Sequence, residues 1–252
     1  MIDHSKMKLG RAEARHDRRT LQLSKYLPGT LPPPPIACKY SDKVDIFPMY
    51  KNDEIGDCTF ASAAHMIQAW AAAGKSECVD IGDAAVVAAY SASTGYDPNN
   101  PDSDQGAVEL DVLKYWKNTG IGGHKIGAYV SVEPRSTTLV RDAISLFGGL
   151  YIGLALPVAA QHQAVWEVPP GGARGDGKPG SWGGHAVPIL DYDPRGLSVV
   201  TWGAVKRLSW GFLRLYCEEA YAILSEDFVT DGKAGSGFDV ATLQADLALL
   251  GH

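Results

Sequence analysis

The feature of this sequence that most constrains its fold is a change of hydrophobic pattern near His124. Before it, three segments carry apolar residues at helical spacing, at residues 58–73, 83–93 and 108–118. After it, short apolar segments predict strands at residues 125–132, 149–156, 185–192, 197–202 and 220–224. A helical first half followed by a strand-rich second half predicts the α+β class, with two lobes around one cleft.

Weaker local signals complete the predicted element order. Ser136 is a capping residue for a helix that runs to Leu146, a short helix is expected at residues 210–216, and a further strand is considered at residues 164–168. A loop rich in Gly and Pro occupies residues 169–184. We expect residues 232–252 to form a tail with a glycine-rich joint and a small amphipathic helix.

Composition narrows the function classes. The chain has 252 residues, of which 45% are hydrophobic and 21% charged, as in an ordinary globular protein. Its net charge of −6 does not favour nucleic-acid binding. The longest apolar run, at residues 146–160, is interrupted by Gly and Pro and is too short to cross a membrane. Because the first residues lack the apolar stretch of a signal peptide, we expect a soluble, cytoplasmic protein.

The first 40 residues differ from the rest. They carry eight Lys or Arg residues against three Asp or Glu, so the basic arm precedes an acidic body. The arm contains the run Pro32–Pro35, which favours a stiff, extended segment. An arm of this charge is expected either to dock on the body or to remain a solvated tail.

Cys58 is the strongest candidate for chemistry. The four cysteines, Cys38, Cys58, Cys78 and Cys217, lack the spacing of a metal site or a disulfide scaffold. Only Cys58 opens an Ala-rich helix, and His185 enters a strand 127 residues later. That arrangement is typical of a thiol nucleophile paired with a histidine base. The alternative is a small buried hydrophobe, the usual role of a free cysteine.

Other histidines fit the role of the base less well. His65 lies two turns along the same predicted helix, about 10 Å from its start, and is expected to be structural. His162 is the second choice because it precedes a possible strand. Asp57 stands immediately before the helix and is interpreted as its cap.

Several short patterns then occur in a characteristic order along the chain: Asn52, Cys58 to Ala63, Asp104-Gln105-Gly106, Gly149 to Leu156, His185-Ala186-Val187 and Trp202-Gly203. This order resembles the papain-like cysteine peptidase superfamily over residues 45–225. Together with the charge and composition of the two ends, the resemblance divides the chain into a basic, Pro-rich arm at 1–40, a papain-like domain at 41–231 and a tail at 232–252. Within the domain it implies a helical lobe at 41–123, an antiparallel, β-barrel-like lobe at 124–231, and an active-site cleft between them.

The same resemblance implies roles for individual residues. Cys58 would be the nucleophile, His185 the general acid and base, and Asn52 a donor to the oxyanion. Gly106 would line the substrate groove. Val200 stands where the family has the asparagine that orients its histidine, and valine cannot form such a hydrogen bond. Either Thr201 takes that role through a small register shift, with Trp202 as a shield, or the site is a bare Cys-His dyad.

The sequence therefore predicts a thiol-dependent hydrolase that cleaves peptide or isopeptide bonds and needs no cofactor and no metal. Its expected partner is a peptide or protein substrate, with neither nucleic acid nor membrane, and the oligomeric state is left open. A non-catalytic protein that binds a peptide or protein in the same cleft is the main alternative. A third is another acyl-transfer enzyme, such as a cell-wall amidase or transglutaminase-like protein. The arm is hypothesised to run back over the cleft, as a pro-segment does, or to pack outside it.

Overall fold

The computed structural model describes residues 4–27, 33–75, 78–225, 227–230, 233–234 and 245. Its α-helices are α1 (Cys58–Trp70), α2 (Asp83–Thr94), α3 (Glu109–Asn118), α4 (Thr137–Phe147) and α5 (Trp210–Tyr216). Its strands are β1 (Cys38–Lys39), β2 (Ile126–Ser131), β3 (Leu150–Leu156), β4 (Gly183–Asp193), β5 (Gly196–Thr201), β6 (Ala204–Leu208), β7 (Cys217–Ser225), β8 (Val229–Thr230) and β9 (Lys233–Ala234).

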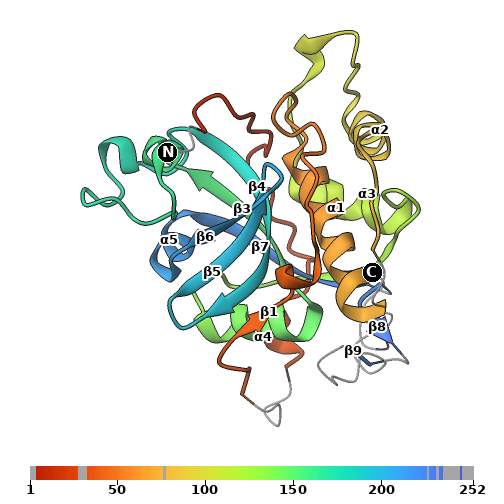
Figure 1. The fold of residues 1–252 in the computed structure, drawn as a ribbon, viewed down its shortest axis with the longest axis vertical. Coiled ribbons are helices and arrows are strands. Elements are labelled where there is room, and N and C mark those ends of the chain that lie inside the picture. Colours follow the sequence, from red (N-terminus) through yellow and green to blue (C-terminus); the bar gives the residue numbers. More distant parts are fainter. Residues whose placement is uncertain are drawn as a thin grey trace.

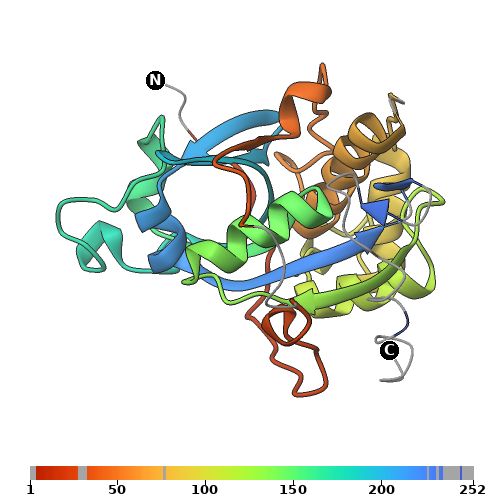
Figure 2. The same cartoon turned by 90° about the horizontal axis from the view of Figure 1, so that it is seen from below.

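The helices α1 to α3 form one lobe and the main sheet forms the other (Figure 1). The described strands of that sheet follow the order β2-β7-β3-β4-β5-β6, with β1 paired to β4, and the neighbours are antiparallel. Seen from below, the sheet curls like an open barrel, and α4 lies across it (Figure 2). This architecture confirms the predicted α+β fold with a helical first lobe and a strand-rich second lobe.

Helix α1 lies at the centre of the molecule, and all of its 13 residues are buried. Small side chains make this possible, because a helix rich in alanine can be packed on every face. Ser62 Oγ donates to the carbonyl of Ala186 at 2.7 Å, and Tyr151 Oη donates to the carbonyl of Thr59 at 2.9 Å. These two bonds fix the start of α1 against the middle of the sheet.

Local capping explains where two of the predicted helices begin. Ser136 accepts a hydrogen bond from the N–H of Leu139 and precedes α4, as the sequence indicated. Ser209 caps α5 in the same way through the N–H of Phe212. Helix α1 stops three residues before its predicted end, because the chain widens into a π-helical turn at Ala71–Lys75.

Two strand predictions were incomplete. Residues 164–168 form no strand, and only Trp166 makes an isolated bridge, to Leu208. The strand β6 was not predicted, because Lys206 and Arg207 break its apolar pattern. The predicted tail helix at 232–252 falls almost wholly outside the described residues. No helix among the described residues is long and apolar enough to cross a bilayer.

Candidate active site

Cys58 is the first residue of α1 and is completely buried. Its Sγ accepts a hydrogen bond from the N–H of Ala186 at 3.4 Å. Because Ala186 follows His185 on β4, the thiol lies beside the strand that carries the predicted base. The start of a helix carries unpaired backbone N–H groups and a partial positive charge, which favour a thiolate.

His185 is held in place from two sides. Its Nε2 lies 2.8 Å from Oγ1 of Thr201, and the indole of Trp202 stacks on its ring at a centroid distance of 4.6 Å. The other ring nitrogen, Nδ1, is buried and has no hydrogen-bond partner among the described residues. The threonine therefore fixes Nε2, and Nδ1 is the ring nitrogen that has no hydrogen bond within the part of the chain that the structure describes.

The alternation of side chains along β5 explains why Thr201 faces the histidine and Val200 does not. Successive residues of a strand point to opposite faces. Val200 packs into a small apolar cluster with Phe47, Ala69 and Leu190 on the other side. The hydroxyl of Thr201, the last residue of β5, is thus brought to His185. A hydroxyl both donates and accepts, so it can bond to the neutral or the protonated ring.

Asn52 lies in a strained turn just before α1. The preceding residues, Tyr50 and Lys51, have φ angles of 55° and 65°, which side chains other than glycine rarely adopt. Trp202, at φ 46°, is the other described non-glycine residue with positive φ. Such strain is often concentrated at functional sites. The Asn52 amide donates to Asp57 Oδ1 at 3.2 Å.

Asp57 precedes α1, but its side chain does not form the predicted cap hydrogen bond. It instead accepts from Asn52, and its Oδ2 is buried without a partner among the described residues. Burial raises the pKa of this carboxyl to about 8. The predicted cap is therefore wrong, and Asp57 instead orients the side-chain amide of Asn52.

Gly106 lines a narrow groove that the arm fills. It has a φ of +71°, and a Cβ there would lie 2.1 Å from the carbonyl oxygen of Gly10. A Cβ on Gly10 would lie 1.7 Å from the carbonyl oxygen of Gly56. The two walls are joined through Asp104, which accepts from the Gly56 N–H at 2.9 Å and from the hydroxyl of Tyr90. The backbone of the arm therefore passes between glycines that leave no room for a side chain.

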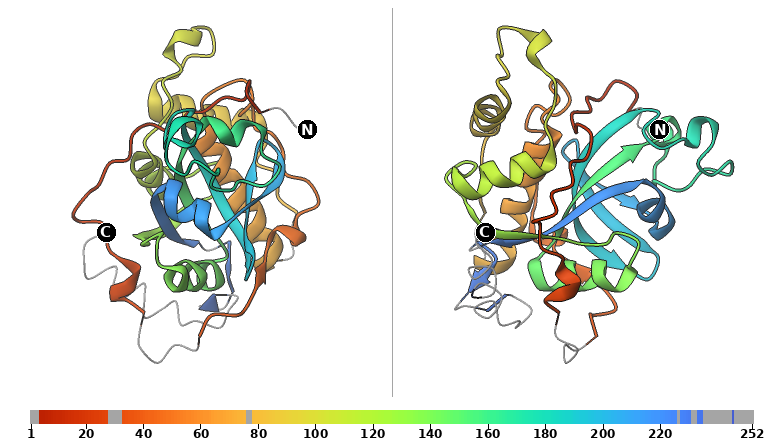
Figure 3. Two further views of the ribbon diagram at one scale, coloured as in Figure 1. Left: turned by 90° about the vertical axis from the view of Figure 1, so that its left-hand side faces the viewer. Right: turned by 180° about the vertical axis from the view of Figure 1, so that it is seen from behind.

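The arm binds this groove as an extended peptide. Ala107 and the arm pair in a parallel bridge, in which its N–H donates to Gly10 and its carbonyl accepts from Ala12. On the opposite wall, the N–H of Arg11 donates to the carbonyl of Gly184 at 3.1 Å. The arm runs along the boundary between the helices and the sheet (right view of Figure 3).

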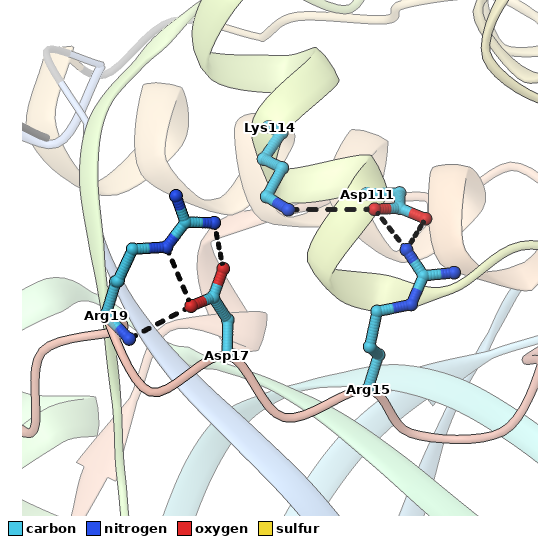
Figure 4. A network of polar contacts seen from close by, with 5 residues as sticks. All are labelled: Arg15, Asp17, Arg19, Asp111 and Lys114. Atoms are coloured by element: carbon cyan, nitrogen blue, oxygen red, sulfur yellow. Dashed lines mark hydrogen bonds and ion pairs between the residues drawn. The ribbon is translucent and has the colours of Figure 1, made fainter.

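Beyond the cleft, surface ion pairs attach the arm to α3. Arg15 makes two bonds to the carboxylate of Asp111, at 2.7 and 2.9 Å (Figure 4). Asp17 and Arg19 pair with one another within the arm. Both members of the Arg15–Asp111 pair are substantially exposed, so this pair contributes little, about 0–1 kcal/mol.

With the arm in place, the thiol and the imidazole are both neutral. Burial raises the pKa of Cys58 to about 12, although hydrogen bonds from the N–H groups of Ala186 and Gly10 act in the opposite direction. Burial, together with the charges of Arg11 and His4, lowers the pKa of His185 to about 3. The arm residues thus disfavour the thiolate–imidazolium pair that a cysteine nucleophile requires.

The remaining predicted residues lie elsewhere or play structural roles. Nε2 of His65 lies 2.8 Å from the carbonyl oxygen of Pro48, and burial lowers the pKa of its ring to about 4. His162 ends a short helix at Val158–His162 and lines a cavity with His4 and Thr201. Sequence reasoning missed Glu109 and Glu219, which surround Arg11, because neither stands in a recognisable motif.

No protein-family model and no curated protein matches this sequence. Solved structures do match its fold. Xylellain, a cysteine protease from Xylella fastidiosa, has a TM-score of 0.64 and 14% identity, over 87% of this chain and 97% of that one. Procathepsin L 3 of the Tenebrio molitor larval midgut has a TM-score of 0.59 and 10% identity, over 88% and 77%.

Bromelain from Ananas comosus, solved with the inhibitor E64, has a TM-score of 0.55 and 12% identity, over 76% of this chain and 100% of that one. The fold agrees while few residues are shared. The match extends over most of the helices and the antiparallel sheet of this chain. The protein therefore has a divergent papain-like fold.

Proposed function

We propose that this protein is a thiol-dependent hydrolase of peptide or isopeptide bonds, and that its arm is an internal inhibitor. The observation that supports this most strongly is the extended peptide that lies at Cys58. Gly10 of the arm donates its N–H to the sulfur and fits between Gly56 and Gly106. A groove that binds the backbone of one peptide can accept another when the first has left.

The reaction would begin once the arm has moved away. Water then reaches Cys58 and His185, and the positive charge of Arg11 is removed from the imidazole. Proton transfer from Sγ to Nδ1 gives the thiolate and the imidazolium. The sulfur attacks the carbonyl carbon of the scissile bond, and the imidazolium protonates the leaving amine. Water, deprotonated by the imidazole, releases the acyl group and regenerates the thiol.

In this mechanism two groups stabilise the oxyanion of the tetrahedral intermediate. They are the backbone N–H of Cys58, at the start of α1, and the side-chain amide of Asn52. Removing one oxyanion donor in a comparable enzyme costs about 2.7–4 kcal/mol. The arm itself is not positioned for attack, because its Gly10 presents an N–H to the sulfur rather than a carbonyl carbon.

The test uses the full-length protein and a variant that displaces the arm. Gly10→Ala places a Cβ 1.7 Å from the Gly56 oxygen and should expel this part of the arm. We expect Gly10→Ala to hydrolyse a mixed library of fluorogenic peptides faster than wild type, and Gly10→Ala/Cys58→Ala to show no turnover. Gly127→Ala is the matched control, because its Cβ would find space at 3.7 Å.

Hydrolysis that persists without the Cys58 thiol would rule out this mechanism. The second candidate function is a non-catalytic protein that binds a peptide in the same groove. The observation in its favour is the complete burial of Cys58 beneath a bound peptide segment. That reading predicts that Gly10→Ala binds library peptides without cleaving them, and that its Cys58 is alkylated only near pH 8.5, as an ordinary thiol is.

A further inference from the structure

A buried acidic pocket beside the nucleophile holds a single arginine of the arm. Arg11 follows Gly10, the residue whose N–H meets the sulfur, and is only 6% exposed. Its Nη1 donates to Glu219 at 2.9 Å, and its Nη2 pairs with Glu218. The carboxyl of Glu109 acts on the same guanidinium from the start of α3.

The pocket accommodates the long side chain of Arg11. Its wall includes Gly153 of β3, where a Cβ would lie 2.7 Å from Arg11 Cδ and 2.8 Å from Glu109 Oε1. Glycine at this position therefore leaves the space that the arginine occupies. Glu219 is held in place by Tyr221, whose hydroxyl donates to Oε2 at 2.9 Å. The acidic wall is thus fixed by its own contacts as well as by the arm.

The buried carboxylate of Glu219 requires a cation, whereas burial raises the pKa of Glu109 and favours its neutral form. Glu109 and Glu219 are 0% and 4% exposed, and both carboxyl oxygens of Glu109 are buried without a hydrogen-bond partner in the described part of the chain. Removing one partner of a buried ion pair leaves an uncompensated charge and is strongly unfavourable. When Arg11 leaves, another positive group is needed to take its place.

We propose that this pocket, formed by Glu109, Glu218 and Glu219, selects an arginine side chain in the peptide that replaces the arm. The selected residue is adjacent to the one that contacts Cys58. The planar guanidinium has enough donors for two carboxylates at once, whereas the ammonium of lysine is a compact point charge. The inference rests on the proposed function for its substrate class, and the same acidic wall explains why the arm carries Arg11.

The experiment compares probes that differ in charge but not in shape. The full-length Arg11→Ala variant, whose pocket is vacated, is treated with four chloromethyl ketones: acetyl-Arg-Ala, acetyl-Ala-Arg and their citrulline counterparts. Citrulline retains the shape of arginine without its charge. For at least one of the two residue orders, Arg-Ala or Ala-Arg, the arginine probe should label Cys58 at least tenfold faster than its citrulline counterpart. Labelling is followed by the intact mass of the protein.

Two further substitutions show which carboxylate causes the preference for arginine. Glu219→Gln in the same background should reduce the arginine preference to less than about threefold. Glu218→Gln is the matched control with the smaller expected loss, because the Glu218 side chain is 47% exposed and its charge is screened. Equal labelling by the arginine and citrulline probes, with normal iodoacetamide labelling of Cys58, would overturn the pocket proposal and leave the proposed function standing.

A second measurement does not depend on the reactivity of the thiol. In Arg11→Ala, agmatine should raise the unfolding temperature, and the neutral butylurea should not. Glu219→Gln should abolish the agmatine effect. If no reagent labels Cys58 but agmatine still stabilises the variant, the proposed function fails and the cation pocket survives. If agmatine has no effect and the probes show no preference, the pocket proposal is wrong.

Discussion

At the scale of single residues, the candidate site differs from its sequence pattern in how the histidine is held. A hydroxyl at Thr201 stands 2.8 Å from Nε2 of His185, while the adjacent Val200 belongs to an apolar cluster. The stacked indole of Trp202 restricts the ring further. The histidine is therefore positioned by one hydrogen bond and one aromatic face, which makes Thr201 the residue on which its orientation depends most directly.

Thr201→Val tests this hydrogen bond. In the Gly10→Ala background, the change should lower kcat/KM for peptide hydrolysis roughly tenfold to a hundredfold, since a hydrogen bond to a charged group contributes about 1.5–3 kcal/mol. Thr201→Ser retains the hydroxyl and should keep most of the activity. Unchanged kinetics in Thr201→Val would show that Trp202 alone is enough to hold the ring.

Asn52→Ala tests the oxyanion donor separately from the nucleophile. The substitution should lower kcat roughly 100- to 1,000-fold in the Gly10→Ala background, the effect expected for one lost oxyanion donor. The rate of iodoacetamide alkylation at Cys58 should remain within about twofold, because alkylation develops no oxyanion. If hydrolysis and alkylation both slowed to the same extent, Asn52 would affect the reactivity of the Cys58 thiol and not the stability of the oxyanion.

At the scale of elements, two of the ion pairs that attach the arm differ in strength. Near the cleft, Arg11 is buried among carboxyl groups, whereas Arg15 makes an exposed pair with Asp111 on α3. Exposed pairs are screened by water and salt, but breaking a buried pair leaves a charge without compensation. We therefore expect the inner contact to hold the arm at Cys58 more strongly than the outer contact does.

Two arginine substitutions in the full-length chain measure this difference. Arg11→Ala should increase the rate of iodoacetamide alkylation at Cys58 at least tenfold, because the arm loses its buried anchor. Arg15→Ala, the matched surface change, should alter the rate by less than about threefold. Equal effects of the two substitutions would indicate that the arm is held mainly by its surface charge.

At the scale of the whole molecule, the buried carboxyl groups link stability to pH. The pKa of Asp57 is about 8 in the folded protein, against 3.8 for an ordinary aspartate, because burial disfavours its charged form. The folded state therefore holds this proton more tightly than the unfolded chain does. The stability contributed by the group is complete below about pH 4 and is lost as the pH rises toward 8.

Asp57→Asn should remove this part of the pH dependence. Wild type is expected to unfold at a lower urea concentration at pH 8 than at pH 5, and the variant should show a smaller decrease between the two. Asp193→Asn provides a contrast, because the pKa of Asp193, which pairs with Arg207, is lowered rather than raised. An identical decrease in Asp57→Asn and wild type would mean that Asp57 is not buried as a neutral acid.

The order of helices and strands could be predicted from the local hydrophobic pattern. Helical spacing at 83–93 and 108–118, and apolar segments at 149–156 and 185–192, correspond to α2, α3, β3 and β4 within a few residues. Such periodicity reflects which face of an element is buried, so it can be read from neighbouring residues. Strand β6 was missed because Lys206 and Arg207 break its apolar pattern, and the segment at 164–168 was misjudged because Trp166 makes only an isolated bridge, to Leu208.

By itself, the sequence determined the two-lobe α+β architecture and singled out Cys58, His185 and Asn52. Only the tertiary structure decided which of Val200 and Thr201 faces His185, and that Asp57 meets Asn52. It alone brought Arg11 to Glu219, a contact between residues 208 positions apart. The physical reason is that periodicity is a local property, whereas burial and charge compensation arise when distant segments pack together and exclude water.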